Sequence, residues 1–187
     1  MQTSFPTYQS LDALTTRLSN LQNQSLRRGE AVVLGRAGEY VAQVLIESAP
    51  ETAWQVLTDF EHLAQFLPNV AATQVLEASA QRTVVEQTNV SQILFAQMQS
   101  KIRTENRVMA PGKLGFRLLE GDLSHLQGYW QVLPLSMSQV FVMQVVSAEA
   151  DMGLLEGSFH LLFRETLKHT LTAIQQEAQG RALLQAA

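Results

Sequence analysis

Residues 54–70 carry the most specific pattern in the chain and run Trp54-Gln55-Val56-Leu57-Thr58-Asp59-Phe60-Glu61-His62-Leu63-Ala64-Gln65-Phe66-Leu67-Pro68-Asn69-Val70. Apolar residues at helical spacing predict a short helix here, with a buried stripe formed by Ala53, Trp54 and Leu57. A second short helix is expected over residues 61–66. Pro68 ends it, because proline lacks the N–H that a helix needs. The pattern therefore predicts two short helices in quick succession.

The segment before these helices predicts a strand. Side chains from Ala31 to Glu47 alternate with a period of two, and residues 35–38, Gly-Arg-Ala-Gly, interrupt the run as a turn or bulge. Ser48 is expected to start the next helix, because its hydroxyl can cap free backbone N–H groups while Glu51, three residues later, reaches back to it.

The segment after Pro68 predicts a long antiparallel meander. Short polar or glycine breaks separate six runs: Val70–Glu77, Thr83–Ser91, Ile93–Met109, Leu114–Asp122, Gly128–Leu133 and Gln139–Ser147. Residues 152–179 then follow a 3.6-residue period with one broad apolar stripe, which predicts a long closing helix. Since the helix has an apolar stripe and the sheet needs one face covered, we expect an α+β fold. In this fold one curved sheet of about seven strands wraps the helix.

The N-terminal region predicts one further amphipathic helix. Its stripe is Leu11, Leu14, Leu18, Leu21 and Ser25, after a possible N-cap at Ser10. The last strand is apolar on both faces, with Val140, Val142 and Val146 opposite Phe141 and Met143. A strand of this kind should be covered on both sides. We expect the N-terminal helix or another subunit to cover its outer face.

Composition limits the function classes. The chain has 187 residues, a net charge of -4 and no cysteine. A single domain of this length buries enough surface to fold without a metal or disulfide. The weakly acidic charge argues against a nucleic-acid partner, and no signal peptide or membrane-spanning run is found. We expect a cytoplasmic protein with residues 1–30 as a tail and helix, 31–180 as the domain, and 181–187 as a C-terminal tail.

Two sequence blocks resemble a known superfamily. Residues 54–70, with Val75-Leu76-Glu77 beyond them, and Gly128-Tyr129-Trp130-Gln131-Val132-Leu133-Pro134 are similar to the START-like (SRPBCC) superfamily, in its polyketide cyclase/dehydrase and coenzyme Q-binding branch. The resemblance covers Gly38 to about Gln179. It implies the helix-grip fold, with a cavity between the sheet and the C-terminal helix. Two features of the family can be assigned to positions of this chain. One is the elbow between the two short helices, residues 59–69, and the other is the strand that contains Trp130.

The resemblance also implies that an apolar small molecule binds in this cavity. A binding cavity needs apolar walls with a few placed polar groups. The candidate ligand-binding residues come from the elbow, three strands and the closing helix: Phe66, Leu67, Phe116, Leu118, Trp130, Phe141, Met143, Phe159, Leu162, Phe163 and Thr166. For any one of these residues taken alone, a packed core is the better interpretation, and the fold is what favours a cavity for the set.

Catalytic chemistry has little support in the sequence. The four histidines lack the spacing of a helical metal pair, and no metal or cofactor site is expected. Asp59 is interpreted as a helix cap. Arg103, Glu105 and Arg107 alternate on one strand face and are interpreted as a solvated charge ladder. The alternative is that one arginine turns inward to hold a polar group of the ligand.

We therefore expect a non-enzymatic binder or carrier of a quinone, isoprenoid, pigment or lipid. One alternative is a cyclase or dehydratase that acts on a polyketide-like substrate, which would need a buried acid or base. Another is a ligand-gated assembly module that docks a partner through its N-terminal helix. Peripheral membrane contact, and a homo-oligomer formed through the N-terminal helix or the last strand, also stay open.

Overall fold

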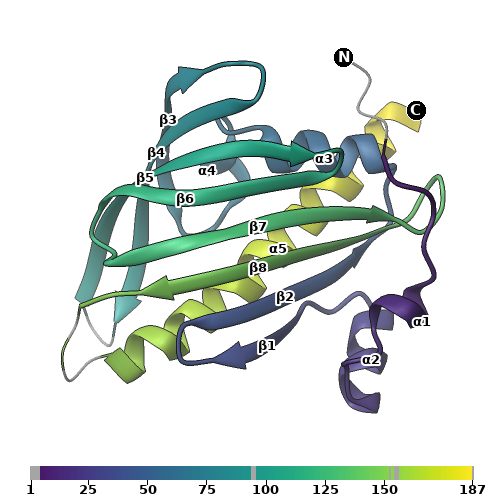
Figure 1. Cartoon of the computed structure of the whole chain (residues 1–187), viewed down its shortest axis with the longest axis horizontal. Coiled ribbons are helices and arrows are strands. Elements are labelled where there is room, and N and C mark those ends of the chain that lie inside the picture. The colour runs from purple at the N-terminus through teal and green to yellow at the C-terminus, as the bar shows by residue number, and fades with distance from the viewer. Residues whose placement is uncertain (1–4, 94–95, 152, 154–155, 187) are drawn as a thin grey trace.

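The computed structural model describes residues 5–93, 96–151, 153 and 156–186 (Figure 1). Its strands are β1 (Val32–Arg36), β2 (Glu39–Ile46), β3 (Val70–Ala78), β4 (Arg82–Ile93), β5 (Ala96–Ala110), β6 (Lys113–Gly121), β7 (His125–Pro134) and β8 (Val140–Glu149). The helices are α1 (Leu11–Leu14), α2 (Asn20–Arg27), α3 (Pro50–Thr58), α4 (Leu63–Phe66) and α5 (Glu156–Ala186). This element order confirms the predicted α+β class.

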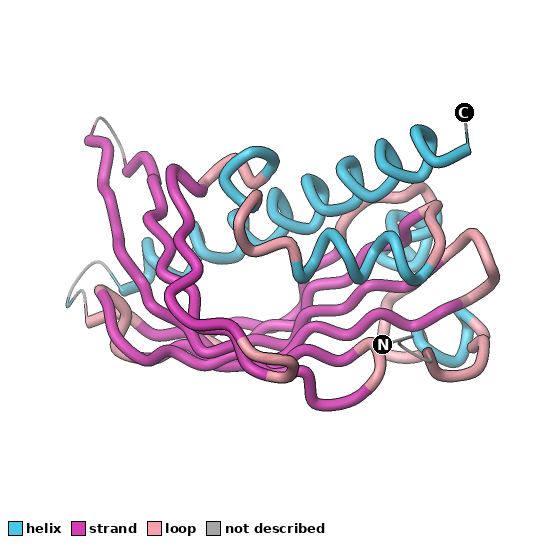
Figure 2. Tube along the Cα trace, turned by 90° about the horizontal axis from the view of Figure 1, so that it is seen from above, coloured by secondary structure: helices cyan, strands magenta, loops and turns pink. Residues whose placement is uncertain are grey.

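All eight strands form one antiparallel sheet in the order β1-β2-β8-β7-β6-β5-β4-β3. Figure 2 shows α5 running across one side of the sheet, while the strands at one end turn up beside it. We call this side the inner face and the opposite side the outer face. The curved sheet around a long C-terminal helix is the helix-grip architecture that was expected.

The predicted strand over residues 31–47 is in fact a hairpin of β1 and β2, which makes eight strands instead of about seven. Gly35 and Gly38 both have positive φ, at 97° and 90°, and Ala37 between them has φ 52°. A Cβ at Gly35 would lie 2.0 Å from the carbonyl oxygen of Glu39. Only glycine permits this close approach, so the interruption reverses the chain instead of bending it.

The N-terminal segment forms two short helices, and the prediction of one continuous helix is wrong. Ser19 caps α2 in a complete capping box, in which its hydroxyl accepts from the Gln22 N–H while the Gln22 side chain accepts from the Ser19 N–H. Ser10 precedes α1 without a side-chain cap bond. The leucine spacing continues through the break, which is why periodicity alone missed it.

Two other helix ends differ from the prediction. The N-cap of α3 is Ala49, without a side-chain cap bond. The third helical position is then Thr52 instead of Glu51. The expected capping box of Ser48 and Glu51 therefore does not form, because the helix begins one residue later than predicted. Helix α5 continues to Ala186, through the expected tail. Residues 152, 154 and 155, at the start of the predicted closing helix, lie outside the described residues.

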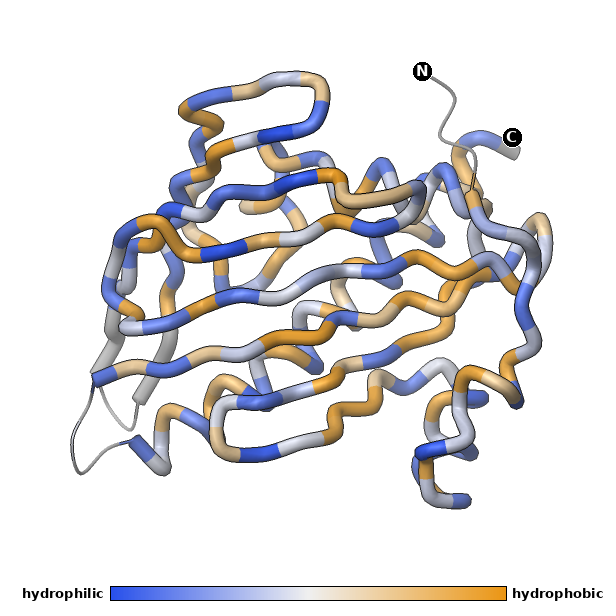
Figure 3. Tube along the Cα trace, in the orientation of Figure 1, coloured by the Kyte–Doolittle hydropathy of each residue, from blue (hydrophilic) through white to orange (hydrophobic). Residues whose placement is uncertain are grey.

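β8 separates two apolar clusters. Val140, Val142 and Val146 are buried in the main core beneath α5. Phe141, on the outer face, is 1% exposed and belongs to an outer cluster with Leu26, Val32, Leu45 and Leu133, against which α1 and α2 residues pack. The N-terminal helices therefore cover the outer face as expected, but Phe141, not the valines, lies under them. Figure 3 shows the apolar stretches of β2, β7 and β8 that build both clusters.

No helix within the described ranges is long and apolar enough to cross a bilayer.

Candidate ligand-binding site

A cavity of about 580 Å³ lies between the inner face of the sheet, α5 and the elbow. The elbow contributes Phe60, Leu63 and Leu67, and α5 contributes apolar side chains from Phe159 to Ile174. Val56 and Leu57 of α3 also line it, and the sheet forms the remaining wall with inner-face residues that lie mainly on β4 to β8. A volume of this size lies within the usual range for small-molecule sites.

Seven of the eleven predicted site residues line this cavity: Leu67, Phe116, Trp130, Phe159, Leu162, Phe163 and Thr166. Those on α5 share one face because they recur at helical spacing. Phe66 and Leu118 pack against the main core, but the cavity lining does not include them.

Phe141 and Met143 do not line the cavity, and their prediction as site residues is wrong. Both belong to the outer cluster. Successive side chains of a strand point to opposite faces, so the inner-facing residues of this part of β8 are Val142, Gln144 and Val146. Since every residue from Val140 to Met143 is apolar, their pattern does not distinguish the two faces of the strand.

Sequence reasoning missed the polar part of the lining. Thr104 and Asn106 face the cavity from β5, and the Asn106 amide donates to the Thr104 hydroxyl at 3.1 Å. Gln144 faces it from β8 and is 8% exposed. Gln144 stands out as the one polar residue in the otherwise apolar run of β8 from Val140 to Val146, but the face that it lies on could not be assigned from the sequence.

Gly128 makes room for an aromatic wall of the cavity. A Cβ at this position would lie 2.9 Å from Cζ of Phe116 and 2.0 Å from the carbonyl oxygen of Val145. Gly128 and Phe116 are cross-strand partners on β7 and β6. The glycine of the Gly-Tyr-Trp block therefore lets the Phe116 ring lie close against the strand.

Aromatic residues hold α5 against β2 at one end of the site. The rings of Tyr40 and Phe163 have centroids 5.8 Å apart, and those of Phe163 and Phe159 are 5.5 Å apart. The Tyr40 hydroxyl donates to the carbonyl oxygen of His160 at 3.2 Å. This packing fixes the rotation of α5, and with it the direction of its cavity-lining side chains.

Asp59 is the C-cap residue of α3, but its carboxylate connects the elbow to α5 instead of capping backbone N–H groups as expected. Its carboxylate accepts hydrogen bonds from His62 Nδ1 at 2.6 Å and from Arg181 Nη2 at 2.8 Å. Burial opposes ionisation of Asp59, but these two hydrogen bonds outweigh it, so its pKa is lowered. The ionised carboxylate thus holds the elbow to the last turns of α5.

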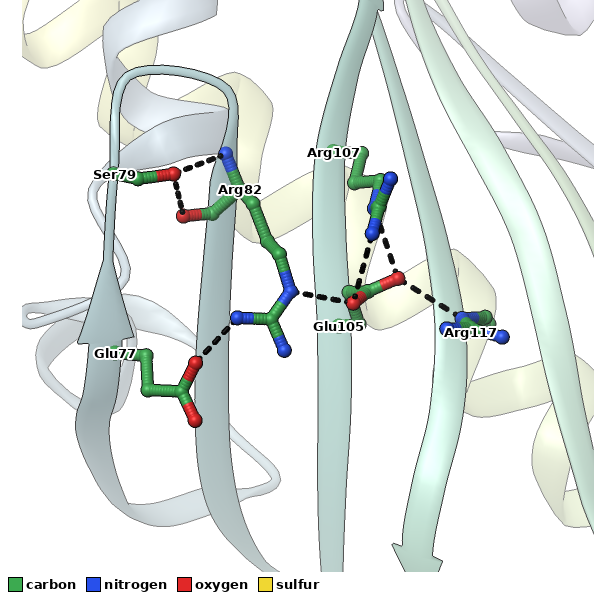
Figure 4. Close-up of polar contacts among 6 residues, drawn as sticks. All are labelled: Glu77, Ser79, Arg82, Glu105, Arg107 and Arg117. Atoms are coloured by element: carbon green, nitrogen blue, oxygen red, sulfur yellow. Dashed lines mark hydrogen bonds and ion pairs between the residues drawn. The ribbon is translucent and has the colours of Figure 1, made fainter.

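The charge ladder of β5 lies on the outer face, away from the cavity. Glu105 is 4% exposed, and its carboxylate accepts from Arg82, Arg107 and Arg117 on three neighbouring strands (Figure 4). The pKa of Glu105 is lowered to about 2. The hydrogen bond from Arg82 contributes most and the one from Arg107 contributes next, against the opposing effect of desolvation. The ladder is therefore not fully solvated, because the Glu105 carboxylate is buried beneath three arginines. The alternative of an arginine that turns inward to the ligand is not found either, since the described cavity lining contains no arginine.

Residues 46–175 match the family described as polyketide cyclase / dehydrase and lipid transport. The chain belongs to this family. The curated Ribosome association toxin RatA of Escherichia coli K12 is 23% identical over 135 residues, which cover 72% of this chain and 83% of RatA. The toxin PasT of another Escherichia coli strain matches over the same share of both chains at the same identity.

Several solved structures are similar in fold to this family member. A START superfamily protein from Mycobacterium smegmatis has a TM-score of 0.66 at 17% identity, covering 80% of this chain and 99% of its own. The Zhui aromatase/cyclase from Streptomyces sp. R1128 has a TM-score of 0.64 at 14% identity, covering 80% and 95%. Family and fold together support a role in ligand binding or lipid transport, and cyclases are among the similar structures.

The cavity of this family member offers hydrogen bonds but few charges. Asp122 is the one titratable residue in the described lining; it is exposed, and its carboxylate accepts from the Lys101 backbone N–H at 2.7 Å. In the described parts of the chain, no group of three or more His, Asp or Glu could hold a metal ion. The chemistry that the described lining supports is therefore apolar contact with amide and hydroxyl hydrogen bonds.

Proposed function

We propose that this protein binds and carries an apolar small molecule in the cavity between its sheet and α5, without transforming it. One observation carries the proposal: the cavity of about 580 Å³ is mainly apolar, and in its described lining the one titratable residue is the exposed Asp122. Quinones, isoprenoids, pigments and lipids are the ligand classes that such walls would suit.

The alternative of a cyclase or dehydratase needs an acid or base that reaches the bound substrate. The described lining supplies amides and hydroxyls at depth, with Asp122 held at the rim by the Lys101 N–H. Carriage therefore agrees better with this lining than proton transfer does.

The direct test is to purify the protein natively, extract it with organic solvent and identify co-purifying molecules by mass spectrometry. A matched pair of variants locates the site. Leu162→Trp places a larger side chain into the cavity, whereas Leu161→Trp changes the neighbouring residue, which is 66% exposed and does not line it.

We expect an apolar molecule in extracts of the wild-type protein and of Leu161→Trp, and a several-fold smaller amount from Leu162→Trp. Thermal unfolding checks that both variants are folded. If the wild-type extract contains no apolar molecule and quinones or fatty alcohols do not raise its Tm, the proposed function is wrong. Equal amounts from both variants would place binding elsewhere.

A further inference from the structure

Gln144 lies in the part of the cavity wall that β8 forms, which we call the cavity floor, and its neighbours there are apolar. It is 8% exposed, and its cross-strand partners are Ala42 on β2 and Trp130 on β7. Val142 and Val146 flank it on the same face of β8. Among these neighbours an amide side chain is costly to bury unless it makes hydrogen bonds.

The side-chain oxygen of Gln144, Oε1, is buried and accepts no hydrogen bond from the described residues. A buried acceptor left without a donor destabilises the fold. Asn106, the other buried amide in the lining, differs because its amide bonds to Thr104. Among the described lining residues, Gln144 is therefore the buried polar group that is left to pair with a bound molecule.

We propose, on the basis of the proposed function, that the ligand is an apolar molecule with a hydroxyl group, an alcohol or a phenol, which hydrogen-bonds to the Gln144 amide. A hydroxyl both donates and accepts, so it satisfies the amide whichever way its oxygen and nitrogen are oriented. The rest of the ligand contacts the aromatic and aliphatic walls, beginning with Trp130 beside Gln144.

The charges around the cavity favour a neutral hydroxyl over an anionic head group. A buried carboxylate or phosphate needs a cationic partner, and the described lining contains no lysine, arginine or histidine. Asp122 at the rim adds a negative charge. A free fatty acid or a phospholipid head group is therefore a poorer match for this floor than an alcohol or phenol.

The test compares two probes of similar shape, 2-naphthol and 2-methylnaphthalene, which differ in the hydroxyl. Their affinities are measured for the wild-type protein and for Gln144→Met, which removes the amide and keeps an unbranched side chain. Gln43→Met is the matched control. Gln43 is also buried, and its Oε1 accepts no hydrogen bond from the part of the chain that the structure describes. It pairs with Met143 on the outer face and is not in the described cavity lining.

We expect Gln144→Met to weaken 2-naphthol binding by roughly 3- to 10-fold, the effect of one hydrogen bond, and to leave 2-methylnaphthalene binding within about 2-fold. Gln43→Met should change neither affinity. Thermal unfolding is measured first, and Gln144→Leu replaces Gln144→Met if that variant does not fold.

Three outcomes contradict the proposals in different ways. If neither probe binds the wild-type protein, the proposed function fails. If both probes bind and Gln144→Met changes them equally or not at all, binding stands and the hydroxyl assignment is overturned, as it would be if a water molecule pairs with Gln144. If Gln43→Met weakens 2-naphthol as strongly, the effect does not arise in the cavity and the assignment is also overturned.

Discussion

Arg181, near the end of α5, donates a hydrogen bond from Nη2 to Oδ2 of Asp59 at 2.8 Å. Both side chains are mostly buried, with exposed fractions of 26% and 22%. Arg181 also donates from Nε to Glu177 at 2.7 Å, so its guanidinium is held within α5 while it reaches the elbow. The closing helix is thus tied to the segment that forms one wall of the cavity.

A double-mutant cycle of Arg181→Met and Asp59→Asn should give a coupling of about 1 kcal/mol in urea unfolding at pH 7, because the pair is partly desolvated. The lowered pKa of Asp59 predicts the pH dependence. The coupling is complete well above the ordinary Asp value of 3.8 and is lost as the pH falls below it. A coupling below about 0.3 kcal/mol at pH 7 would contradict this role.

Glu105→Gln should lower Tm by several degrees at pH 7, because it leaves Arg82, Arg107 and Arg117 around a neutral amide. The folded pKa of about 2 lies below the ordinary 4.5, so ionised Glu105 stabilises the protein above about pH 4.5. This contribution disappears as the pH falls towards 2. The Tm difference between wild type and variant should shrink over that window, and a constant difference would exclude the explanation.

Leu26→Ala should cost about 3 kcal/mol in the free energy of unfolding, because Leu26 is fully buried in the outer cluster against β8. Leu21→Ala is the control in the same helix. Leu21 is 76% exposed, and its truncation should change stability by less than about 0.5 kcal/mol. Equal effects in urea unfolding would mean that α2 does not pack on the sheet in solution.

Gly128→Ala should destabilise the protein by about 3 kcal/mol, because its Cβ would collide with the Phe116 ring and the Val145 carbonyl. Binding of an apolar probe should weaken as well, since Phe116 lines the cavity. Gly180→Ala is the control on α5. Nothing lies within 4 Å of its Cβ, and alanine should stabilise the helix by up to about 1 kcal/mol. A variant at position 128 as stable as wild type would refute the close approach.

Most of the fold could be predicted because its elements have clear periods. The meander of β3 to β8 alternates, and α5 repeats with its apolar face towards the sheet. The break between α1 and α2 was not predicted, because the leucine spacing continues across it. Ser19 with Gln22, three residues later, was the available signal, since this pair forms the capping box.

The candidate site was only partly predictable. Phe159, Leu162, Phe163 and Thr166 line the cavity because one helical period sets their direction. For β8, the sequence contains no information on which apolar face meets α5, and the choice depends on the N-terminal helices packing against Phe141. The Asp59–Arg181 contact could not be foreseen, because it joins residues 122 positions apart.

The sheet order has a consequence for how the chain is made. β2 pairs with β8, whose residues follow it by about a hundred positions. On the ribosome, β2 therefore leaves the exit tunnel long before its partner exists, with only the β1 hairpin beside it. Joining such distant strands closes a long loop, which slows folding. The pairing of β2 with β8 must therefore wait until residues 140–149 have been synthesised.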